Sequence, residues 1–294
     1  MSICWVTGAQ GQVGRALKHL VEFQKNQNYL FLTRAKLDIT DPSAVQKLAV
    51  SNPPNCIINL AAYTDVNGAE NNHEKAYLVN SIGVRNLAMI AAMRDAALIQ
   101  ISTDYVFDGS KLSPYVETDE TNPLNIYGKS KLKGEEYAQN LCSKLLVIRT
   151  SWIFSEFGNN FVTTMIRLLS KQTPFRVIDD QLGGPTSARS LAAALYQISS
   201  QVVSDQTFNH WGIFHFCQKP YVSWFDFCCK TQEFLAHQQE TCSFPMPCSS
   251  GDFPQTAARP HNSTLNCKKI ERLGLLTTSW LSDLQRVVNF YDSS

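Results

Sequence analysis

The sequence has little net charge, no long apolar run and no Cys-x-x-Cys pair. Its 294 residues include 26 Lys and Arg and 25 Asp and Glu, which gives a net charge of +1. This balance argues against a nucleic-acid or acidic-membrane partner, because such partners select a basic surface. No stretch approaches the ~18 consecutive apolar residues of a membrane span, and the first residues lack the apolar segment of a signal peptide. We therefore expect a cytoplasmic protein with neither a membrane nor a nucleic acid as partner.

Nine cysteines and six histidines are present, but their spacing fits neither a disulfide framework nor a metal site. The cysteine count is odd, and Cys4 and Cys56 lie in apolar strand-like runs, where a free thiol behaves as a small hydrophobic group. The histidines show no ligand spacing. We expect reduced, mostly buried thiols and no metal site.

The first 150 residues alternate between strand-like and helix-like segments. These segments cover 3–7, 12–23, 29–33, 43–50, 56–61, 69–94, 97–102, 130–142 and 145–150. This alternation predicts an α/β fold, a Rossmann-type doubly wound parallel sheet with helices on both faces. Such a sheet binds ligands at the carboxyl ends of its strands.

A glycine-rich turn, TGAQGQVG at 7–14, follows the first predicted strand. Gly8, Gly11 and Gly14 allow a tight turn, a close approach of the backbone to a pyrophosphate and tight packing of the next helix. The N-terminus of that helix would direct its amides and dipole at the pyrophosphate. The strand–turn–helix context indicates a dinucleotide site, and the alternative is a turn that merely needs glycine.

Thr33 and Arg34 follow the second predicted strand, and no acid occurs before Asp38. A carboxylate at this place binds the 2′-hydroxyl of the adenosine ribose, whereas a cation accepts a 2′-phosphate. Arg34 therefore favours acceptance of NADPH, unless it is an ordinary solvated charge.

Tyr127 and Lys131 are four residues apart and so share one face of a predicted helix. A phenol with the reference pKa of ~10 is a poor acid–base catalyst at neutral pH. Because an ammonium stabilises a phenolate, we expect Lys131 to lower the pKa of Tyr127 and make it a workable proton donor. Thr103, just after the fourth predicted strand, can hydrogen-bond the same substrate oxygen. A solvated helix face is the alternative for the Tyr-x-x-x-Lys spacing.

The pattern is looser after residue 150. Helices are expected over 160–170, 187–200, 223–237 and 267–291, a strand over 212–216 and a long loop over 238–260. The length fits about two domains at ~100–200 residues each. We expect a dinucleotide-binding domain over 1–150. A smaller, mixed α/β domain over 151–294 would bind mainly the substrate, with some segments returning to the first domain.

Several motifs carry a resemblance to a known family. The glycine-rich turn, 61–64 (AAYT), 102–104 (STD) and the Tyr127/Lys131 pair resemble the extended short-chain dehydrogenase/reductases. Narrower motifs resemble the dTDP-4-dehydrorhamnose reductases of that superfamily. They are 37–41 (LDITD), 102–109 (STDYVFDG), 114–115 (PY), 149–152 (RTSW), 158–161 (GNNF), 180–186 (DQLGGPT) and 259–265 (RPHNSTL). The resemblance spans essentially the whole chain.

This resemblance implies roles for individual residues. Gly11, Gln12 and Val13 would contact the cofactor pyrophosphate, and Asp38 and Ile39 its adenine side. The path to the nicotinamide would be lined by Ala62, Tyr63 and Thr64. Tyr127 and Lys131 would also hold the nicotinamide ribose, and the sugar would meet Thr103, Asp104 and Trp152.

Two of the implied substrate residues have structural alternatives. Trp152 would pack its aromatic face on a hexose, or else fill the core. Arg259 would clamp a diphosphate bidentately, with Asn262 and Ser263 adding donors, or else serve as a structural arginine.

The activity implied is reduction of the C4 ketone of dTDP-4-dehydro-L-rhamnose to dTDP-L-rhamnose, with NADPH or NADH as cofactor. The partner would be a small nucleotide sugar, and a homodimer is compatible with the resemblance. Two alternatives stay open: another nucleotide-sugar epimerase or dehydratase of the superfamily, and a non-catalytic subunit like the regulatory subunit of methionine adenosyltransferase.

The chain departs from the family at several positions. Some relatives bind Mg²⁺ through glutamates at a dimer interface, but Arg15 and Arg189 occupy two such positions here, so we expect no metal. Asn67 stands where the family tends to have Asp, and Cys217-Gln218 where it tends to have Ser-Gly. We expect these changes to affect the packing of the substrate domain and not the chemistry.

Overall fold

The computed structural model describes residues 2–25, 28–171, 173–236, 243–253 and 256–292. At its centre is a six-stranded sheet in the order β10-β5-β4-β3-β1-β2, with every neighbouring pair parallel. The strands are β1 (Cys4–Thr7), β2 (Tyr29–Leu32), β3 (Cys56–Asn59), β4 (Ala97–Thr103), β5 (Leu145–Thr150) and β10 (Gly212–His215).

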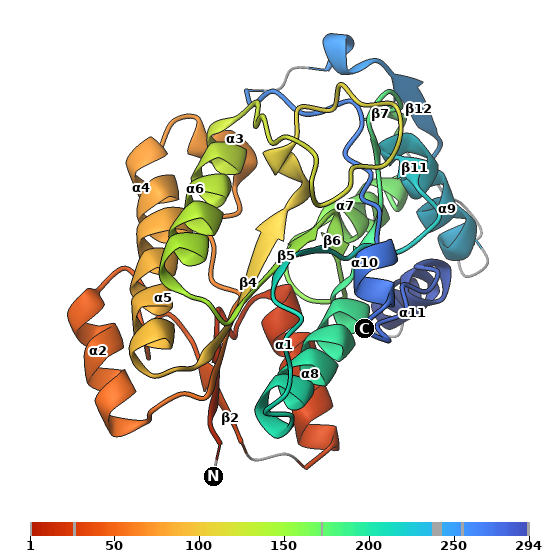
Figure 1. Cartoon of the computed structure of the whole chain (residues 1–294). Coiled ribbons are helices and arrows are strands. Elements are labelled where there is room, and N and C mark those ends of the chain that lie inside the picture. The colour runs from red at the N-terminus through yellow and green to blue at the C-terminus, as the bar shows by residue number, and fades with distance from the viewer. Residues whose placement is uncertain (1, 26–27, 172, 237–242, 254–255, 293–294) are drawn as a thin grey trace.

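Helices cover both faces of this sheet (Figure 1). One face carries α2 (Pro42–Ser51), α4 (His73–Tyr77), the π-helical η1 (Leu78–Ile82), α5 (Gly83–Met93) and α6 (Ile126–Leu141). The other face carries α1 (Gln12–Phe23) and α8 (Ala188–Ser204). Two short helices, α3 (Val66–Ala69) and the 3₁₀-helix η2 (Asp104–Val106), follow β3 and β4.

Alternate residues of the strands pack on opposite faces, which explains the continuous apolar runs in the sequence. Trp5 and Ile57 lie in the core under α2, α5 and α6. Their neighbours Val6 and Ile58 pack against α1 and α8. The α/β class and the doubly wound parallel sheet are therefore confirmed.

The rest of the chain forms a smaller lobe with its own core, which includes Phe154, Phe227 and Trp280. Its elements are β6 (Ile153–Phe154), α7 (Phe161–Leu169), β7 (Phe175–Ile178), β8 (Leu182–Gly183), β9 (Thr186–Ser187), β11 (Val222–Ser223), α9 (Trp224–Ala236), β12 (Pro245–Cys248), η3 (Ser250–Asp252) and α11 (Leu281–Asp292). By contrast, α10 (Lys268–Glu271) packs on the central sheet, because its Ile270 belongs to the core of that sheet.

Four elements differ from the sequence-based expectation. The stretch 69–94 holds parts of several helices rather than one, and α6 begins at Ile126, four residues before the predicted start. The loop expected over 238–260 contains β12 and η3, and its residues 238–242 and 254–255 lie outside the described residues. The helix expected over 267–291 is split, because residues 272–280 between α10 and α11 are not helical.

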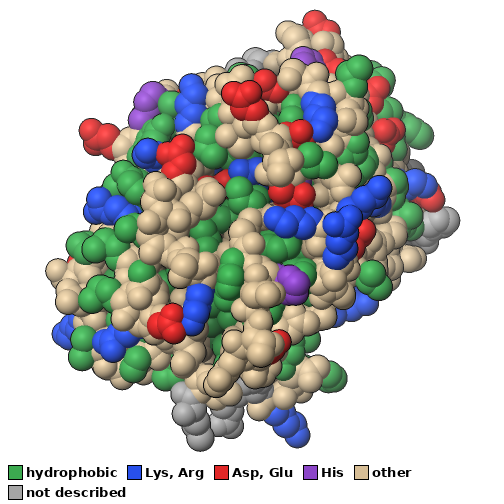
Figure 2. Space-filling model, in the orientation of Figure 1, with side chains coloured by type: hydrophobic (Ala, Val, Ile, Leu, Met, Phe, Trp, Pro, Cys, Tyr) green, Lys and Arg blue, Asp and Glu red, His purple; other side chains and the backbone are tan. Residues whose placement is uncertain are grey.

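One continuous helical stretch, His73–Met93, is long and apolar enough to cross a membrane by length and composition alone. The protein buries 56% of its apolar window. This burial is the pattern of a core helix, and Figure 1 shows α5 lying along the sheet. On the face shown in Figure 2, side chains of both charge signs are interspersed.

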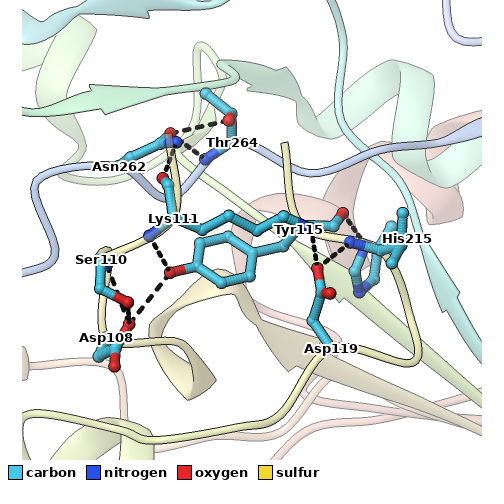
Figure 3. Close-up of polar contacts among 9 residues, drawn as sticks. Asp108, Ser110, Lys111, Tyr115, Asp119, His215, Asn262 and Thr264 are labelled. Carbon is cyan, nitrogen blue, oxygen red and sulfur yellow. Dashed lines mark hydrogen bonds and ion pairs between the residues drawn. The ribbon is translucent and has the colours of Figure 1, made fainter. Parts of the chain in front are cut away.

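A polar cluster, here called the clasp, joins the loop after β4 to the segment before α10 (Figure 3). It comprises Asp108, Ser110, Lys111, Tyr115, Asp119, His215, Asn262 and Thr264. The Tyr115 hydroxyl donates to Asp108 at 3.1 Å, and the Asn262 amide donates to the Lys111 carbonyl at 2.6 Å. The clasp therefore fixes the 102–109 motif against the 259–265 motif.

Candidate active site

A cleft of about 810 Å³ lies at the carboxyl ends of β1, β3, β4 and β5, with residues 152–161 of the smaller lobe along one wall. This is the edge of the sheet at which the strand order reverses, where doubly wound folds bind ligands. All the site residues predicted from the sequence line the cleft except Arg259. They are Gly8, Gly11, Gln12, Val13, Gly14, Arg34, Asp38, Ile39, Ala62, Tyr63, Thr64, Thr103, Asp104, Tyr127, Lys131 and Trp152.

The glycine-rich turn forms the floor of the cleft. Gly8 has a φ of +63°, and a Cβ there would lie 2.6 Å from the Ala61 amide nitrogen. A Cβ on Gly14 would lie 2.7 Å from the Gly8 carbonyl oxygen. The turn is therefore as compact as glycine permits. Because Gly11 caps α1 without a side chain, the first amides of α1 have no intrahelical acceptor and suit an anionic group.

Gln12 does more than its predicted backbone role. Its side-chain oxygen accepts a hydrogen bond from Ser155 at 2.7 Å, and its amide donates to the Ile153 carbonyl at 3.5 Å. These bonds tie the start of α1 to the smaller lobe across the cleft.

Asp38 and Arg34 form an ion pair in the part of the cleft that follows β2, with Nε and Oδ2 3.3 Å apart. The amide and hydroxyl of Thr40 also donate to Asp38. These bonds, together with the pairing to Arg34, hold the pKa of Asp38 below its usual value. Arg34 remains largely exposed, so its positive charge is accessible to a ligand.

Tyr127 and Lys131 both lie on α6. Asn125 caps this helix by accepting the Gly128 amide at 2.8 Å, which places Tyr127 in the first turn and Lys131 one turn further along. The Lys131 ammonium donates to the Ile101 carbonyl at 2.6 Å. Tyr127 hydrogen-bonds the Thr103 side chain, so β4 and α6 bring the three predicted catalytic residues together.

The predicted effect of Lys131 on Tyr127 is wrong for this structure. Burial raises the pKa of Tyr127 to about 12, the hydrogen bond with Thr103 opposes the rise, and the Asp104 charge adds to it. Burial also lowers the pKa of Lys131 to about 8, against the attraction of Glu135. Tyr127 therefore keeps its proton at neutral pH, the form that a proton donor needs.

A buried ion pair supports this group from behind. Arg149 on β5 donates three hydrogen bonds to the Glu135 carboxylate on α6, from Nε to Oε1 at 3.1 Å and to Oε2 at 3.2 Å, and from Nη2 to Oε2 at 2.7 Å. Ser102, next to Thr103, donates to the same carboxylate. These contacts fix the ends of β4 and β5 relative to α6.

Asp104 is the most unusual group in the cleft. Its Oδ1 accepts the Thr103 hydroxyl at 3.0 Å, whereas its buried Oδ2 has no hydrogen-bond partner among the described residues. Burial raises the pKa of Asp104 to about 7, although the hydroxyls of Ser263 and Thr103 oppose the rise.

Trp152 packs against the core of the smaller lobe, as one of its two expected roles requires, and its contact with a hexose stays a prediction. One ring face stacks on Trp224 with centroids 3.4 Å apart, and the half-buried side chain also lines the cleft. Its φ of +48° is uncommon for a bulky residue. Trp224 lines the cleft too, and nothing in the local sequence marked it.

Arg259 lies behind the cleft wall. It donates to the Asn67 side-chain oxygen at 3.1 Å and hydrogen-bonds Tyr105, which lines the cleft. Asn67 therefore does contact the proposed substrate arginine, contrary to our expectation. Asn262 is engaged in the clasp, and the Ser263 hydroxyl donates to the Leu182 carbonyl at 3.3 Å. Neither Asn262 nor Ser263 lines the cleft, and their expected part in binding a diphosphate stays a prediction.

Sequence reasoning also missed Asn80. This buried side chain accepts from the Tyr63 amide at 2.8 Å and donates to the Tyr63 carbonyl and to Ser130. It holds the cleft loop after β3 against α6. It lies in the π-helical turn, and π-helical turns frequently mark functional sites.

The remaining cysteine and metal expectations concern groups outside the cleft. The eight cysteines that the structure describes are free, and six are buried; Cys242 lies outside the described residues. Within the described ranges, no group of three His, Cys, Asp or Glu side chains could hold a metal ion. Gln218 accepts the Ser187 amide and donates to Asp283, so it affects packing of the smaller lobe, as expected.

The fold and the cleft define an α/β oxidoreductase of the short-chain dehydrogenase/reductase type. A family profile described as the RmlD substrate binding domain matches residues 1–293. The dTDP-4-dehydrorhamnose reductase of Aggregatibacter actinomycetemcomitans is 40% identical over 285 residues, covering 96% of this chain and 97% of that protein. The chain belongs to this reductase family.

Two crystal structures agree with the assignment. A dTDP-4-dehydrorhamnose reductase from Clostridium acetobutylicum has a TM-score of 0.90 at 36% identity, covering 98% of this chain and 99% of that one. The enzyme from Bacillus anthracis, in complex with NADP, has a TM-score of 0.89 at 34% identity, with the same coverage.

Proposed function

We propose that this protein reduces the C4 ketone of dTDP-4-dehydro-L-rhamnose to give dTDP-L-rhamnose, with NADPH or NADH as cofactor. The observation that carries the proposal is the meeting of Tyr127, Lys131 and Thr103 in a cleft whose floor is the glycine-rich turn. Family membership indicates the same substrate class.

The residues present fit a dinucleotide. A Cβ at Gly8 or Gly14 would fill the turn on which the pyrophosphate would rest, and the first amides of α1 would bind its charge. Lys131, with its ammonium on the Ile101 carbonyl, would hold the nicotinamide ribose. When bound, the reduced nicotinamide supplies the hydride.

Tyr127 donates its proton to the ketone oxygen as that oxygen becomes an alkoxide. Its raised pKa keeps the proton available at neutral pH. Thr103 orients the carbonyl by hydrogen-bonding the same oxygen, and Trp152 presents the open part of its ring to the sugar. Arg259 acts on the nucleotide diphosphate from beside Tyr105.

The decisive experiment follows NAD(P)H oxidation with dTDP-4-dehydro-L-rhamnose generated in situ, using each cofactor in turn. Net oxidation with formation of dTDP-L-rhamnose supports the proposal. Purified protein that carries stoichiometric NAD and consumes no NAD(P)H would favour an epimerase or dehydratase. Cofactor binding without any turnover would favour a regulatory subunit.

For the cofactor, we propose that Arg34 favours NADPH, because its exposed guanidinium lies where a 2′-phosphate would sit. Arg34→Ala should raise the KM for NADPH about tenfold, the loss of one charge-assisted contact, and leave the KM for NADH nearly unchanged. Lys36→Ala removes an exposed cation two residues away and is the matched control. Equal changes for both cofactors would contradict this role.

For the substrate, Arg259→Ala should raise the KM of the nucleotide sugar far more than that of the cofactor. Arg272→Ala, at an exposed position later in the chain, is the control.

A cytoplasmic location is also proposed, since free thiols such as the adjacent buried pair Cys217 and Cys267 suit a reducing compartment. A homodimer remains compatible with the resemblance.

A further inference from the structure

The Asp104 carboxyl group lies beside the reaction site in an environment that does not suit an ion. Asp104 directly follows Thr103, lines the cleft and is only 3% exposed. Its Oδ1 lies 3.0 Å from the Thr103 hydroxyl oxygen. Its Oδ2 is buried without a hydrogen-bond partner among the described residues. A bare carboxylate oxygen in such a place is costly, whereas a protonated carboxyl group is not.

The Thr103 hydroxyl has one hydrogen and two lone pairs to distribute. The Tyr105 amide donates to one lone pair at 3.2 Å. Asp104 and Tyr127, which both hydrogen-bond Thr103, therefore share the remaining lone pair and the hydrogen.

Two arrangements are possible, and they have opposite consequences. An ionised Asp104 can only accept, so it takes the hydrogen of Thr103, and Tyr127 then donates to Thr103 instead of to a substrate. A protonated Asp104 donates to Thr103, which turns the Thr103 hydrogen towards Tyr127 and the ketone oxygen. Only the second arrangement leaves the Tyr127 proton available for the substrate.

We propose that Asp104 is a positioning residue that works in its protonated form, aiming the hydroxyl hydrogen of Thr103 at the reaction site. This inference rests on the proposed reductase function and assigns Asp104 a role beyond contact with the sugar. The catalytic groups would then be in the correct arrangement only while Asp104 keeps its proton.

The groups around Asp104 favour that protonated form. Tyr105, Tyr127 and Cys217 face Asp104, and the pKa of each is raised, so these three groups stay neutral. They therefore do not attract the Asp104 carboxylate. The Thr103 hydroxyl bonds Oδ1 directly and favours the anion. The nearby Ser263 hydroxyl also lowers the pKa of Asp104, but it donates to the Leu182 carbonyl and leaves Oδ2 without a partner among the described residues. The Arg259 guanidinium hydrogen-bonds the Tyr105 side chain and partly offsets the rise in the pKa of Tyr105. Burial outweighs these contacts and holds the pKa of Asp104 at about 7.

Asp104→Asn tests the proposal, because an amide donates permanently, as a protonated carboxyl group does. Near pH ~6 we expect the kcat of this variant to exceed that of Asp104→Leu, which cannot donate, by at least about tenfold. A loss in the asparagine variant as deep as that in the leucine variant would overturn the proposal, since it would mean that the carboxylate is required.

The pH profile of kcat gives a readout that a purely structural role would not move. In the wild type, kcat should fall as the pH rises through about 7, the pKa of Asp104. Asp104→Asn should lack this fall and retain only the decline that follows deprotonation of Lys131 at about 8. An unchanged profile in the asparagine variant would refute the role.

A titration that needs no turnover separates this inference from the proposed function. Carboxyl ¹³C NMR of the full-length, aspartate-labelled protein, with Asp104→Asn assigning the signal, should give a midpoint near 7. Asp108, whose pKa its hydrogen bonds lower to about 2, is the internal comparison. A midpoint near the ordinary ~3.9 would overturn the inference. Failure of the wild type to reduce the ketone would instead count against the proposed function.

Discussion

Tyr127 keeps its proton at neutral pH because the phenol is buried, and not because of the lysine one turn along the helix. The Lys131 ammonium is directed at the Ile101 carbonyl, 2.6 Å away. The phenol is therefore protonated at neutral pH. It can give up its proton only when the substrate's ketone oxygen becomes negatively charged during the reaction. This division of roles suits reduction, in which a proton is given and not taken.

Replacing Tyr127 with Phe should therefore abolish the donor while keeping the ring that packs edge-on against Tyr105. We expect kcat to fall by about 10²–10⁴, the usual contribution of general acid catalysis. The dissociation constant of NADPH, measured by fluorescence titration, should change little. Tyr137→Phe removes a hydroxyl about three turns further along the same helix and should retain full activity. Near-normal turnover in Tyr127→Phe would rule out this mechanism.

The buried pair Arg149–Glu135 links a strand to a helix and governs how the catalytic elements stand together. Arg149→Met would leave the Glu135 carboxylate buried without its partner. Urea unfolding should then show a loss of about 3–5 kcal/mol, because an unpaired buried charge is strongly destabilising. The surface pair Lys133–Glu136 on α6 gives the control, and Lys133→Met should change stability by at most about 1 kcal/mol.

A second variant distinguishes electrostatics from shape in the same place. Replacing both partners, Glu135→Leu with Arg149→Met, removes the buried charge together with its partner. Much of the lost stability should return, as it does when buried pairs become apolar. A double variant no more stable than Arg149→Met would instead mean that the strand and helix need this particular polar geometry.

The elements that were predictable are those whose burial is periodic or continuous. The strands β1, β3, β4 and β5 could be predicted because each is a short run buried on both faces. The edge strand β2 is only partly buried and was predictable from its continuous apolar run. The start of α6 was missed because Gly128 and Lys129 dilute its pattern, although Asn125 was a usable capping signal. The split between α10 and α11 and the π-helical turn at Leu78–Ile82 depend on tertiary packing, which local propensity does not encode.

The same distinction holds for the site. Tyr127, Lys131 and Thr103 were identifiable because their chemistry matches their spacing and their place at strand ends. Trp224 lines the cleft and Asn80 supports the loop after β3 through tertiary packing, and neither carries a local signal. The expectation that Lys131 lowers the pKa of Tyr127 failed because sequence spacing does not reveal how deeply a phenol is buried.

His215 makes the stability of the whole molecule depend on pH. It is fully buried in the clasp (Figure 3), with Nδ1 3.1 Å from the Tyr115 carbonyl oxygen. Burial and the Arg149 charge lower its pKa to about 3. Because the folded pKa lies below the unfolded value of ~6.5, the stabilisation is complete above pH ~6.5 and is lost as the pH falls towards 3.

We therefore expect thermal unfolding of the wild type to become easier on acidification, by about 1.4 kcal/mol for each pH unit in this window from His215. His215→Gln cannot gain a proton, so its unfolding temperature should depend less on pH below 6.5. His19→Gln, at the surface of α1, is the control. Identical acid sensitivity of His215→Gln and the wild type would contradict this assignment.

The late position of β10 in the sequence affects how the chain can fold while it is being synthesised. β10 pairs with β5, Gly212 beside Leu146, although every element from β6 to α8 lies between them in the sequence. A ribosome that has released only β1 to β5 therefore presents the apolar edge of β5 with no neighbour, and such edges recruit other chains. Long-range closure of this kind is slow. A nascent chain halted before residue 212 should accordingly require a chaperone, and the isolated segment 1–150 should aggregate rather than fold.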